Sequence, residues 1–322
     1  MRVIYYHLKA AAGLLAAAFF SSSLSAEPFA YISNQLDDSV SIIDTAQNTV
    51  IDTVNMTGKP AGVALSPDGK IVYVSTPEAN GFAVIDATQH KVLKQVALGS
   101  SGALGIATDK IGRYLFVADW YKNTVAVINT ENLKVKATIP VGKSPSGLVV
   151  SPDNRWLYVA NRLSNSVSQI DLETLTERAV TKVGEHPFGL SIDSKGERLY
   201  VANVESDDVT VLATEHLKKI ATVKVKTLPY ATALALNDSR LFVTNQEDDS
   251  VSVIDTVTLK ELAVIEVGDK PEGISTHPDG RHVYVANWFD NSVSVIDATT
   301  LTVVNTIATG NGSRAFGQFI SQ

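Results

Sequence analysis

His282-Val-Tyr-Val-Ala-Asn287, followed after three residues by Asn291-Ser-Val-Ser-Val-Ile-Asp297, decides the fold, because near copies of this stretch recur along the chain. The aromatic residue of the first phrase recurs seven times at intervals of 42 or 43 residues, at Tyr31, Tyr73, Phe116, Tyr158, Tyr200, Phe242 and Tyr284. A period of about 40 residues built from short β-type phrases is typical of a β-propeller blade, in which four strands form one sheet.

The unit that begins at Pro145 shows how four strands are predicted from the turns between them. Residues 146–151 and 156–161 flank a hairpin turn, Pro152-Asp-Asn-Arg155. Residues 166–171 form the third expected strand, and the more polar residues 177–182 form an outer strand that faces water. Seven innermost strands crowd round one axis, so each is expected to begin with a small residue: Gly62, Gly105, Gly147, Gly189, Ala231, Gly273 and Ala315.

The two ends of the repeat predict how the ring closes. Residues 28–34 begin at a second strand with no first strand before it, whereas residues 314–320 form a first strand with nothing after it. Pairing them completes one blade and removes open sheet edges. We therefore expect one all-β domain, residues 27–322, a seven-bladed β-propeller of four-stranded antiparallel blades whose C-terminal strand pairs into the N-terminal blade.

Residues 1–26 are predicted to be a secretory signal peptide. Arg2 and Lys9 give a basic start, residues 10–20 are an unbroken apolar run, and small residues lead to a cleavage site after Ala26. The apolar run has 11 residues, and a bilayer needs about 20 residues of helix, so a retained anchor is the weaker alternative. We expect a periplasmic or secreted protein without a membrane anchor after cleavage.

Composition narrows the classes of partner. The net charge is −7 and no basic run occurs, which argues against a nucleic-acid partner, because such binding needs clustered Lys and Arg. The chain has no cysteine, which excludes disulfides and thiol chemistry. A closed propeller leaves little free sheet edge for self-pairing, and we therefore expect a monomer.

Several phrases resemble the YVTN repeat. They are Leu157-Tyr-Val-Ala-Asn161, Leu199-Tyr-Val-Ala-Asn203 and Val283-Tyr-Val-Ala-Asn287, and Val267-Gly-Asp-Lys-Pro-Glu-Gly273 with His277-Pro-Asp-Gly280 fits the same unit. The chain is thus similar to exported bacterial YncE-type propellers and to archaeal surface-layer proteins, and the resemblance implies a non-catalytic binding role. Related propellers include lactone hydrolases, and wider relatives carry haem or serve amine-oxidising enzymes, among which fold alone does not choose.

One residue per blade is expected at the mouth of the central channel, just before the small residue of the innermost strand. Four consecutive blades carry chemically informative residues there, namely Phe188, Tyr230, Glu272 and Arg314. Glu272 and Arg314 belong to neighbouring blades, and they are expected either to pair with each other or to orient a charged ligand. The other three positions hold Ala61, Leu104 and Ser146.

The loops between second and third strands are predicted to share that face. They add Trp120, Tyr121, Arg162, Trp288 and Phe289. Large aromatic residues on loops are enriched in recognition surfaces, although each ring could instead cover the edge of a neighbouring blade. With nearby His186, the predicted binding residues are Leu104, Trp120, Tyr121, Arg162, His186, Phe188, Tyr230, Glu272, Trp288, Phe289 and Arg314.

Signatures of catalysis and of metal binding are missing from the sequence. It has no Gly-x-Ser-x-Gly elbow, no His-Glu-x-x-His and no phosphate-binding glycine loop. Seven Asp or Asn residues at one register are interpreted as turn residues, since they lack calcium-loop spacing: Asp38, Asn80, Asn123, Asn165, Asp207, Asp249 and Asn291. We expect no catalytic residue, no metal and no cofactor.

The leading hypothesis is an exported, non-catalytic scaffold that binds a protein, a peptide or a small molecule at this face. The alternative is a lactonase-like hydrolase, or an accessory subunit of a periplasmic quinone or haem redox system. In that alternative Glu272, Arg314 and His186 would be the working groups.

Overall fold

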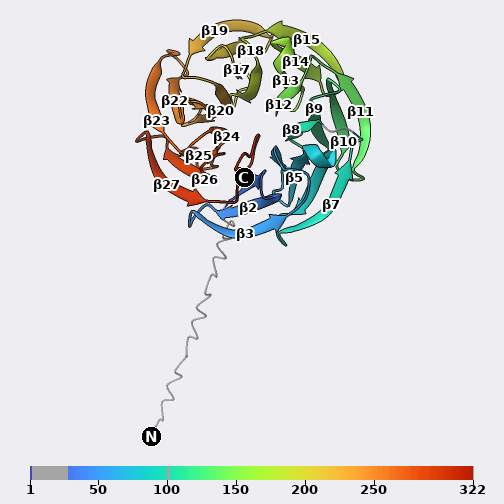
Figure 1. Ribbon diagram of the computed structural model, residues 1–322, viewed down its shortest axis with the longest axis vertical. Coiled ribbons are helices and arrows are strands. Elements are labelled where there is room, and N and C mark those ends of the chain that lie inside the picture. The colour runs from blue at the N-terminus through green and yellow to red at the C-terminus, as the bar shows by residue number, and fades with distance from the viewer. Residues whose placement is uncertain (2–27, 100–101, 322) are drawn as a thin grey trace.

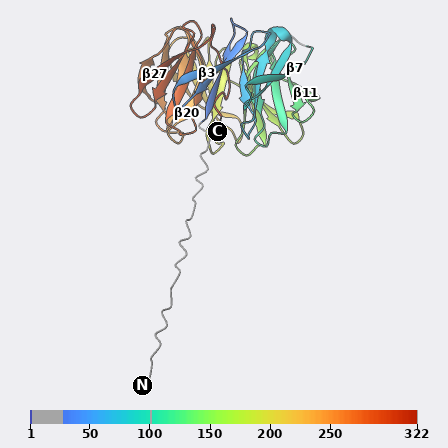
Figure 2. The same ribbon diagram turned by 90° about the horizontal axis from the view of Figure 1, so that it is seen from below.

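The computed structural model describes residue 1, residues 28–99 and residues 102–321, and it shows seven β-sheets arranged in a ring (Figure 1). Seen from its side in Figure 2, the ring has strands that run between its two faces. The prediction of a seven-bladed all-β propeller is confirmed. Apart from Met1, the predicted signal peptide lies outside the described residues.

The blades follow one another in chain order, each built from consecutive strands. Blade 1 holds β1 (Phe29–Asn34), β2 (Ser39–Asp44) and β3 (Thr49–Asn55), and blade 2 holds β4 (Val63–Leu65), β5 (Ile71–Thr76), β6 (Gly81–Asp86) and β7 (Lys91–Ala97). Blade 3 holds β8 (Ala103–Thr108), β9 (Tyr114–Asp119), β10 (Thr124–Asn129) and β11 (Lys134–Pro140), and blade 4 holds β12 (Pro145–Val150), β13 (Trp156–Asn161), β14 (Ser166–Asp171) and β15 (Thr176–Lys182).

The remaining three blades have the same plan. Blade 5 holds β16 (Pro187–Ile192), β17 (Arg198–Asn203), β18 (Asp208–Ala213) and β19 (Lys218–Lys224). Blade 6 holds β20 (Pro229–Ala235), β21 (Arg240–Asn245), β22 (Ser250–Asp255) and β23 (Glu261–Glu266). Blade 7 holds β24 (Pro271–Thr276), β25 (His282–Asn287), β26 (Ser292–Asp297) and β27 (Thr302–Ala308). Two short 3₁₀ turns, η1 (Pro77–Ala79) and η2 (Arg162–Ser164), follow second strands.

The second strand of each blade is the centre of the core. In β13, Leu157, Tyr158 and Val159 are each fully buried, because both faces of the sheet are covered by neighbouring blades. The outer strand β15 has mostly exposed residues, as its polar sequence predicts. Hydrophobic burial between blades therefore holds the ring together.

Small residues on the innermost strands let neighbouring blades approach the axis. A side-chain Cβ at Gly105 would lie 1.7 Å from the Ser146 carbonyl oxygen in the next blade. At Gly273 it would lie 2.0 Å from the Arg314 carbonyl oxygen. Any larger residue at either position would push two inner strands apart, which is why the repeat keeps glycine there.

The repeated Asp and Asn of the loops tie each blade to the next. Asp38 adopts a left-handed backbone conformation (φ 50°), and its Oδ1 accepts the Lys59 N–H, 21 residues later. Asn291 does the same with φ 53° and accepts the Gly312 N–H at 2.7 Å. All seven members of the set have positive φ angles. This geometry supports the interpretation of these residues as turn residues.

The C-terminal segment lies beside β1, inside the ring (Figure 1). The Tyr31 N–H donates to the Phe319 carbonyl at 2.8 Å, and the Arg314 N–H donates to the Ser33 carbonyl at 2.9 Å. The pairing consists of isolated bridges, such as Ala30 with Ile320, rather than a continuous strand. The chain ends thus meet in blade 1 through fewer ladder hydrogen bonds than a regular fourth strand would make.

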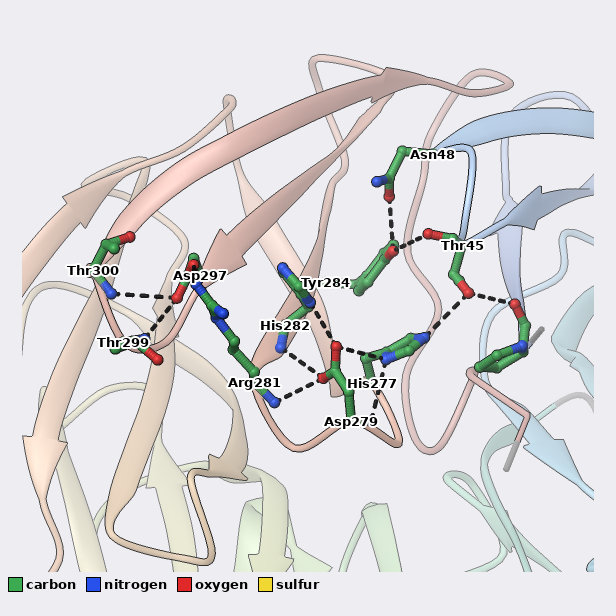
Figure 3. A network of polar contacts seen from close by, with 11 residues as sticks. Thr45, Asn48, His277, Asp279, Arg281, His282, Tyr284, Asp297, Thr299 and Thr300 are labelled. Atoms are coloured by element: carbon green, nitrogen blue, oxygen red, sulfur yellow. Dashed lines mark hydrogen bonds and ion pairs between the residues drawn. The ribbon is translucent and has the colours of Figure 1, made fainter. Parts of the chain in front are cut away.

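A polar network on the turn between β24 and β25 crosses the seam between blades 7 and 1, where it meets the turn between β2 and β3 (Figure 3). His277 Nε2 lies 3.1 Å from Thr45 Oγ1, and the Tyr284 hydroxyl donates to Asn48 Oδ1 at 2.7 Å. Asp279 Oδ2 lies 3.1 Å from His277 Nδ1 and 2.6 Å from the ring Nδ1 of its neighbour His282. Polar contacts across this seam thus supplement the sparse strand pairing.

Candidate functional site

Three aromatic rings close the channel at the face predicted from the sequence. Phe188 and Tyr230 have ring centroids 4.1 Å apart, and Phe316 lies 5.0 Å from Phe188 and 5.5 Å from Tyr230. All three are at least nine-tenths buried. We call these three rings the plug. Since the plug comes from β16, β20 and the C-terminal segment, it packs together parts of the chain far apart in sequence.

A buried ion pair lies beside the plug. Arg314 Nε donates to Glu272 Oε2 at 2.6 Å, and Gln246 Nε2 donates to Glu272 Oε1, also at 2.6 Å. Burial raises the pKa of Glu272, while the Arg314 guanidinium and the Gln246 amide act in the opposite direction. The Arg314 guanidinium also reaches the Tyr230 hydroxyl at 3.4 Å. Glu272 and Arg314 thus form an ion pair, which is one of the two roles expected from the sequence.

The aromatic loop residues differ in exposure. Trp288 is partly buried, and its Nε1 donates to Gln35 Oε1 at 3.2 Å, while its ring packs edge-on against Phe289. Tyr121 is 69% exposed and Phe289 is 64% exposed, and among the described residues no other aromatic side chain is classed as exposed. The predicted contact surface is therefore divided between rings that fill the mouth and rings that face solvent.

Three further predicted residues lie around the plug. The Arg162 guanidinium carbon is 5.8 Å from the Phe188 ring centroid and 5.9 Å from that of Trp120, which allows weak cation–π contacts. Trp120 and Leu104 are partly buried against the same cluster. These side chains support the closed mouth and leave only part of their surface free.

His186 is in a different setting from the one that the hydrolase hypothesis requires. It occupies a turn with φ 53°, its backbone N–H donates to Asn165 Oδ1, and its Nδ1 lies 3.5 Å from Glu205 Oε1. Among the described residues, no hydrogen bond or ion pair joins it to Glu272 or Arg314. The structure does not bring the three proposed working groups together.

Two exposed aliphatic residues on this face were missed by sequence reasoning. Leu36 is 56% exposed and Leu163 is 54% exposed, both two residues past the end of a second strand. Tyr121 and Phe289 occupy the same register in blades 3 and 7, whereas the other three blades carry Glu78, Glu205 and Glu247. Aligning the repeats at this position would have found all four. We call Leu36, Tyr121, Leu163 and Phe289 the apolar rim.

Two further kinds of feature are not found in the described part of the chain. No group of three or more His, Cys, Asp or Glu residues in it could hold a metal ion. None of its helices is long and apolar enough to cross a membrane. We call the face with the plug the closed face. Its two main features are the packed rings of the plug and the exposed side chains of the apolar rim.

These features define a seven-bladed propeller with one channel mouth filled by its own side chains. The YNCE-like beta-propeller family matches residues 7–113 and 174–316, and the chain belongs to this family. The family of seven-bladed lactonase propellers also matches residues 129–218.

Solved structures share this fold at low sequence identity. A protein from Lactobacillus plantarum matches with a TM-score of 0.79 and 19% identity over 91% of this chain and 98% of that chain. Hydrazine synthase from Kuenenia stuttgartiensis matches with a TM-score of 0.75 and 22% identity over 83% of this chain and 91% of that chain. The dihydro-heme d1 dehydrogenase NirN matches with a TM-score of 0.69 and 15% identity, over 90% of this chain and 74% of that chain.

A curated relative matches over a shorter stretch. Antigen Lp49 of Leptospira interrogans serogroup Icterohaemorrhagiae serovar copenhageni is 27% identical over 131 residues, which are 38% of this chain and 28% of that protein. The aligned segment thus spans less than a third of the length of that relative.

Proposed function

We propose that this protein is an exported, non-catalytic scaffold that binds a polypeptide partner on its closed face. The observation that carries the proposal is the apolar rim, because Tyr121 and Phe289 are the two exposed aromatic side chains among the described residues and both lie on the closed face. Exposed aromatic residues that are rimmed by polar groups are a common feature of protein–protein interfaces.

The arrangement of the rim favours a large partner over a small one. Phe289 and Leu36 belong to adjacent blades 7 and 1, and Tyr121 and Leu163 belong to adjacent blades 3 and 4, on the other side of the ring. The plug fills the channel mouth between the two pairs. A small molecule entering from this side therefore meets packed rings, whereas a polypeptide surface can contact both apolar pairs.

The hydrolase alternative receives less support from the geometry. Both carboxylate oxygens of Glu272 accept hydrogen bonds from Arg314 or Gln246, so the carboxylate has structural partners already. A general base must reach the proton that it removes, and His186 lies instead against Glu205. The match to seven-bladed lactonase propellers covers only residues 129–218.

Site-specific photo-cross-linking tests the proposal. A benzophenone amino acid placed at Leu36 or at Leu163 is expected to cross-link the same polypeptide in intact cells. The same label at Ile111, which is 65% exposed on a turn of the opposite face, serves as the control. Equal cross-linking from Ile111, or no adduct from either rim position, would count against the proposal.

A further inference from the structure

A cavity of about 560 Å³ lies in the central channel, behind the plug. Phe188 and Phe316 line its inner end, and the turns between first and second strands line its mouth. We call the face with these turns the open face. Pockets for small molecules commonly have volumes of about 300–1,000 Å³, so the cavity is large enough for a ligand of modest size.

The innermost strand of blade 5, β16, is more accessible than its neighbours in the ring. Its last four residues, Gly189 to Ile192, are all partly exposed, and all four line the cavity. The next two innermost strands, β20 and β24, each have one partly exposed residue, Leu234 and Thr276. Because β16 is an innermost strand, the space that its residues face is the channel.

The channel edge of β16 has backbone groups that its partner strand β17 does not use. The Asp193 N–H donates to the Arg198 carbonyl at 3.0 Å, and an antiparallel ladder alternates between hydrogen-bonded and non-hydrogen-bonded pairs. Counting back along the register from this bond, Ile192 and Leu190 both belong to non-hydrogen-bonded pairs. Their N–H and C=O groups therefore point away from β17, toward the channel.

The equivalent edge in blade 2 is already paired by a segment of polypeptide. Val63 follows Gly62 as Leu190 follows Gly189, so Val63 and Leu190 occupy the same position of the repeat. The Val63 N–H donates to the Phe316 carbonyl of the C-terminal segment at 2.7 Å. An innermost strand of this ring can thus pair with an extended chain inside the channel.

The wall between the mouth and the plug carries no charged side chain among the described residues. It consists of aliphatic side chains and a few uncharged polar ones, such as Ser191, Thr232 and Gln318. The charged residues that line the cavity all belong to the turns at its mouth: Asp109, Lys110, Asp193 and Asp238. Since an unpaired charge is costly to bury, the part of a ligand that lies deep in the channel should be uncharged.

From the cavity, its uncharged wall and the free edge of β16, we propose that the channel binds an extended peptide whose inserted end carries no charge. The peptide adds a strand to β16, and its backbone pairs with the N–H and C=O groups of Leu190 and Ile192. In recognition by strand addition, main-chain hydrogen bonds provide the affinity. The site is separate from the apolar rim and does not depend on the partner of the closed face.

Calorimetric titration with a blocked tripeptide, acetyl-alanyl-valyl-alanine methylamide, tests the backbone pairing. The matched probe has a methyl group on each of the three residue nitrogens, so it keeps the side chains and the apolar surface but loses the N–H donors. We expect the methylated probe to bind at least tenfold more weakly. Equal or tighter binding of the methylated probe would overturn the strand pairing, and no binding of the blocked tripeptide would overturn the site.

The same peptide without its blocking groups tests the requirement for an uncharged end. Alanyl-valyl-alanine has an ammonium group at one end and a carboxylate at the other, and either end would have to lie against the uncharged wall. We expect it to bind at least tenfold more weakly than the blocked tripeptide. Equal affinity would overturn the requirement for an uncharged inserted end.

A proline variant removes one donor from the edge of β16. Leu190→Pro deletes the N–H that faces the channel and that β17 does not use, and proline is tolerated at such edge positions. We expect this variant to bind the blocked tripeptide at least tenfold more weakly. Leu148→Pro, at the same position of blade 4, is the matched control and should keep its affinity. Unchanged affinity in a folded Leu190→Pro protein, or an equal loss in the control, would contradict the proposal.

Hydrogen exchange locates the bound peptide in the wild type and remains usable if a proline variant fails to fold. With the blocked tripeptide at saturating concentration, amide exchange should slow in β16, residues 187–192, because the Leu190 and Ile192 N–H groups gain acceptors. Residues 145–150 of β12 line the same cavity and serve as the control. No protection of β16, or equal protection of β12, would overturn the proposal.

Discussion

Arg314 Nε lies 2.6 Å from Glu272 Oε2, and this ion pair joins the C-terminal segment to the first strand of blade 7 beside the plug. Both side chains are largely buried, with 16% and 4% of their surfaces exposed. The pair thus connects two features of the molecule, the closure of the ring and the closed channel mouth.

Breaking this pair should destabilise the protein more than replacing both partners. Arg314→Met leaves the Glu272 carboxylate buried without its cation, and such a change typically costs about 3–5 kcal/mol. The double variant Glu272→Leu with Arg314→Met removes both charges and should cost far less. Urea unfolding at neutral pH measures both, and equal losses in the two variants would argue against a buried, coupled pair.

The C-terminal segment should contribute strongly to stability although its strand pairing is sparse. Phe319 is fully buried in the core of blade 1. Phe319→Ala is therefore expected to lower the free energy of unfolding by about 3–5 kcal/mol. The exposed Phe289 is a matched control whose change to alanine should have an effect below about 0.5 kcal/mol. If Phe319→Ala cost as little stability as Phe289→Ala, the C-terminal segment would not belong to the core.

Acid should weaken the seam between blades 7 and 1. The pKa of Asp279 is lowered to about 2. Burial by itself would raise this pKa, but hydrogen bonds from the His282 backbone and ring and from the Arg281 N–H outweigh the effect of burial. A lowered folded-state pKa contributes stability that is present above the unfolded value of about 4 and is lost as pH falls toward about 2. Asp279→Asn should therefore lose less stability than the wild type between pH 5 and pH 2, in urea unfolding at each pH. Parallel pH profiles would show that Asp279 has no such role.

The mature protein is expected to begin at Glu27. Mass spectrometry of the protein recovered from a periplasmic fraction checks this directly. The expected mass lacks residues 1–26, because the apolar run of residues 10–20 is typical of a cleaved leader. An intact N-terminus in the cytoplasmic fraction would contradict export.

The blade architecture could be predicted because every repeat carries the same turn residues and the same buried residues at the same positions. Tyr158 and its six equivalents recur with one period, and Gly105 and Gly273 occupy positions where no Cβ fits. Each of these patterns lies within a single repeat, and its recurrence in the other repeats makes the prediction stronger. The number of blades, the antiparallel order and the meeting of the two chain ends all followed from them.

The state of the channel mouth could not be predicted in the same way. Phe188 and Tyr230 were expected to take part in a contact surface, but their exposure depends on Phe316, which arrives from the other end of the chain. Whether a ring is buried is decided by which neighbours fill the space around it. Leu36 and Leu163 were missed because a single aliphatic residue in a loop carries little signal by itself, and the signal appears only when the repeats are aligned at the register that these residues share with Tyr121 and Phe289.

The central claim is that the apolar rim is the contact surface for a polypeptide. The most direct measurement is the affinity of the cross-linked polypeptide, purified, for the wild type and for Tyr121→Ala with Phe289→Ala. We predict at least about a tenfold loss in that variant, because exposed aromatic anchors dominate interface energies. Ile111→Ala with Val257→Ala, two exposed positions on the open face, should bind like the wild type. Unchanged affinity in the rim variant, or an equal loss in the open-face variant, would contradict the account.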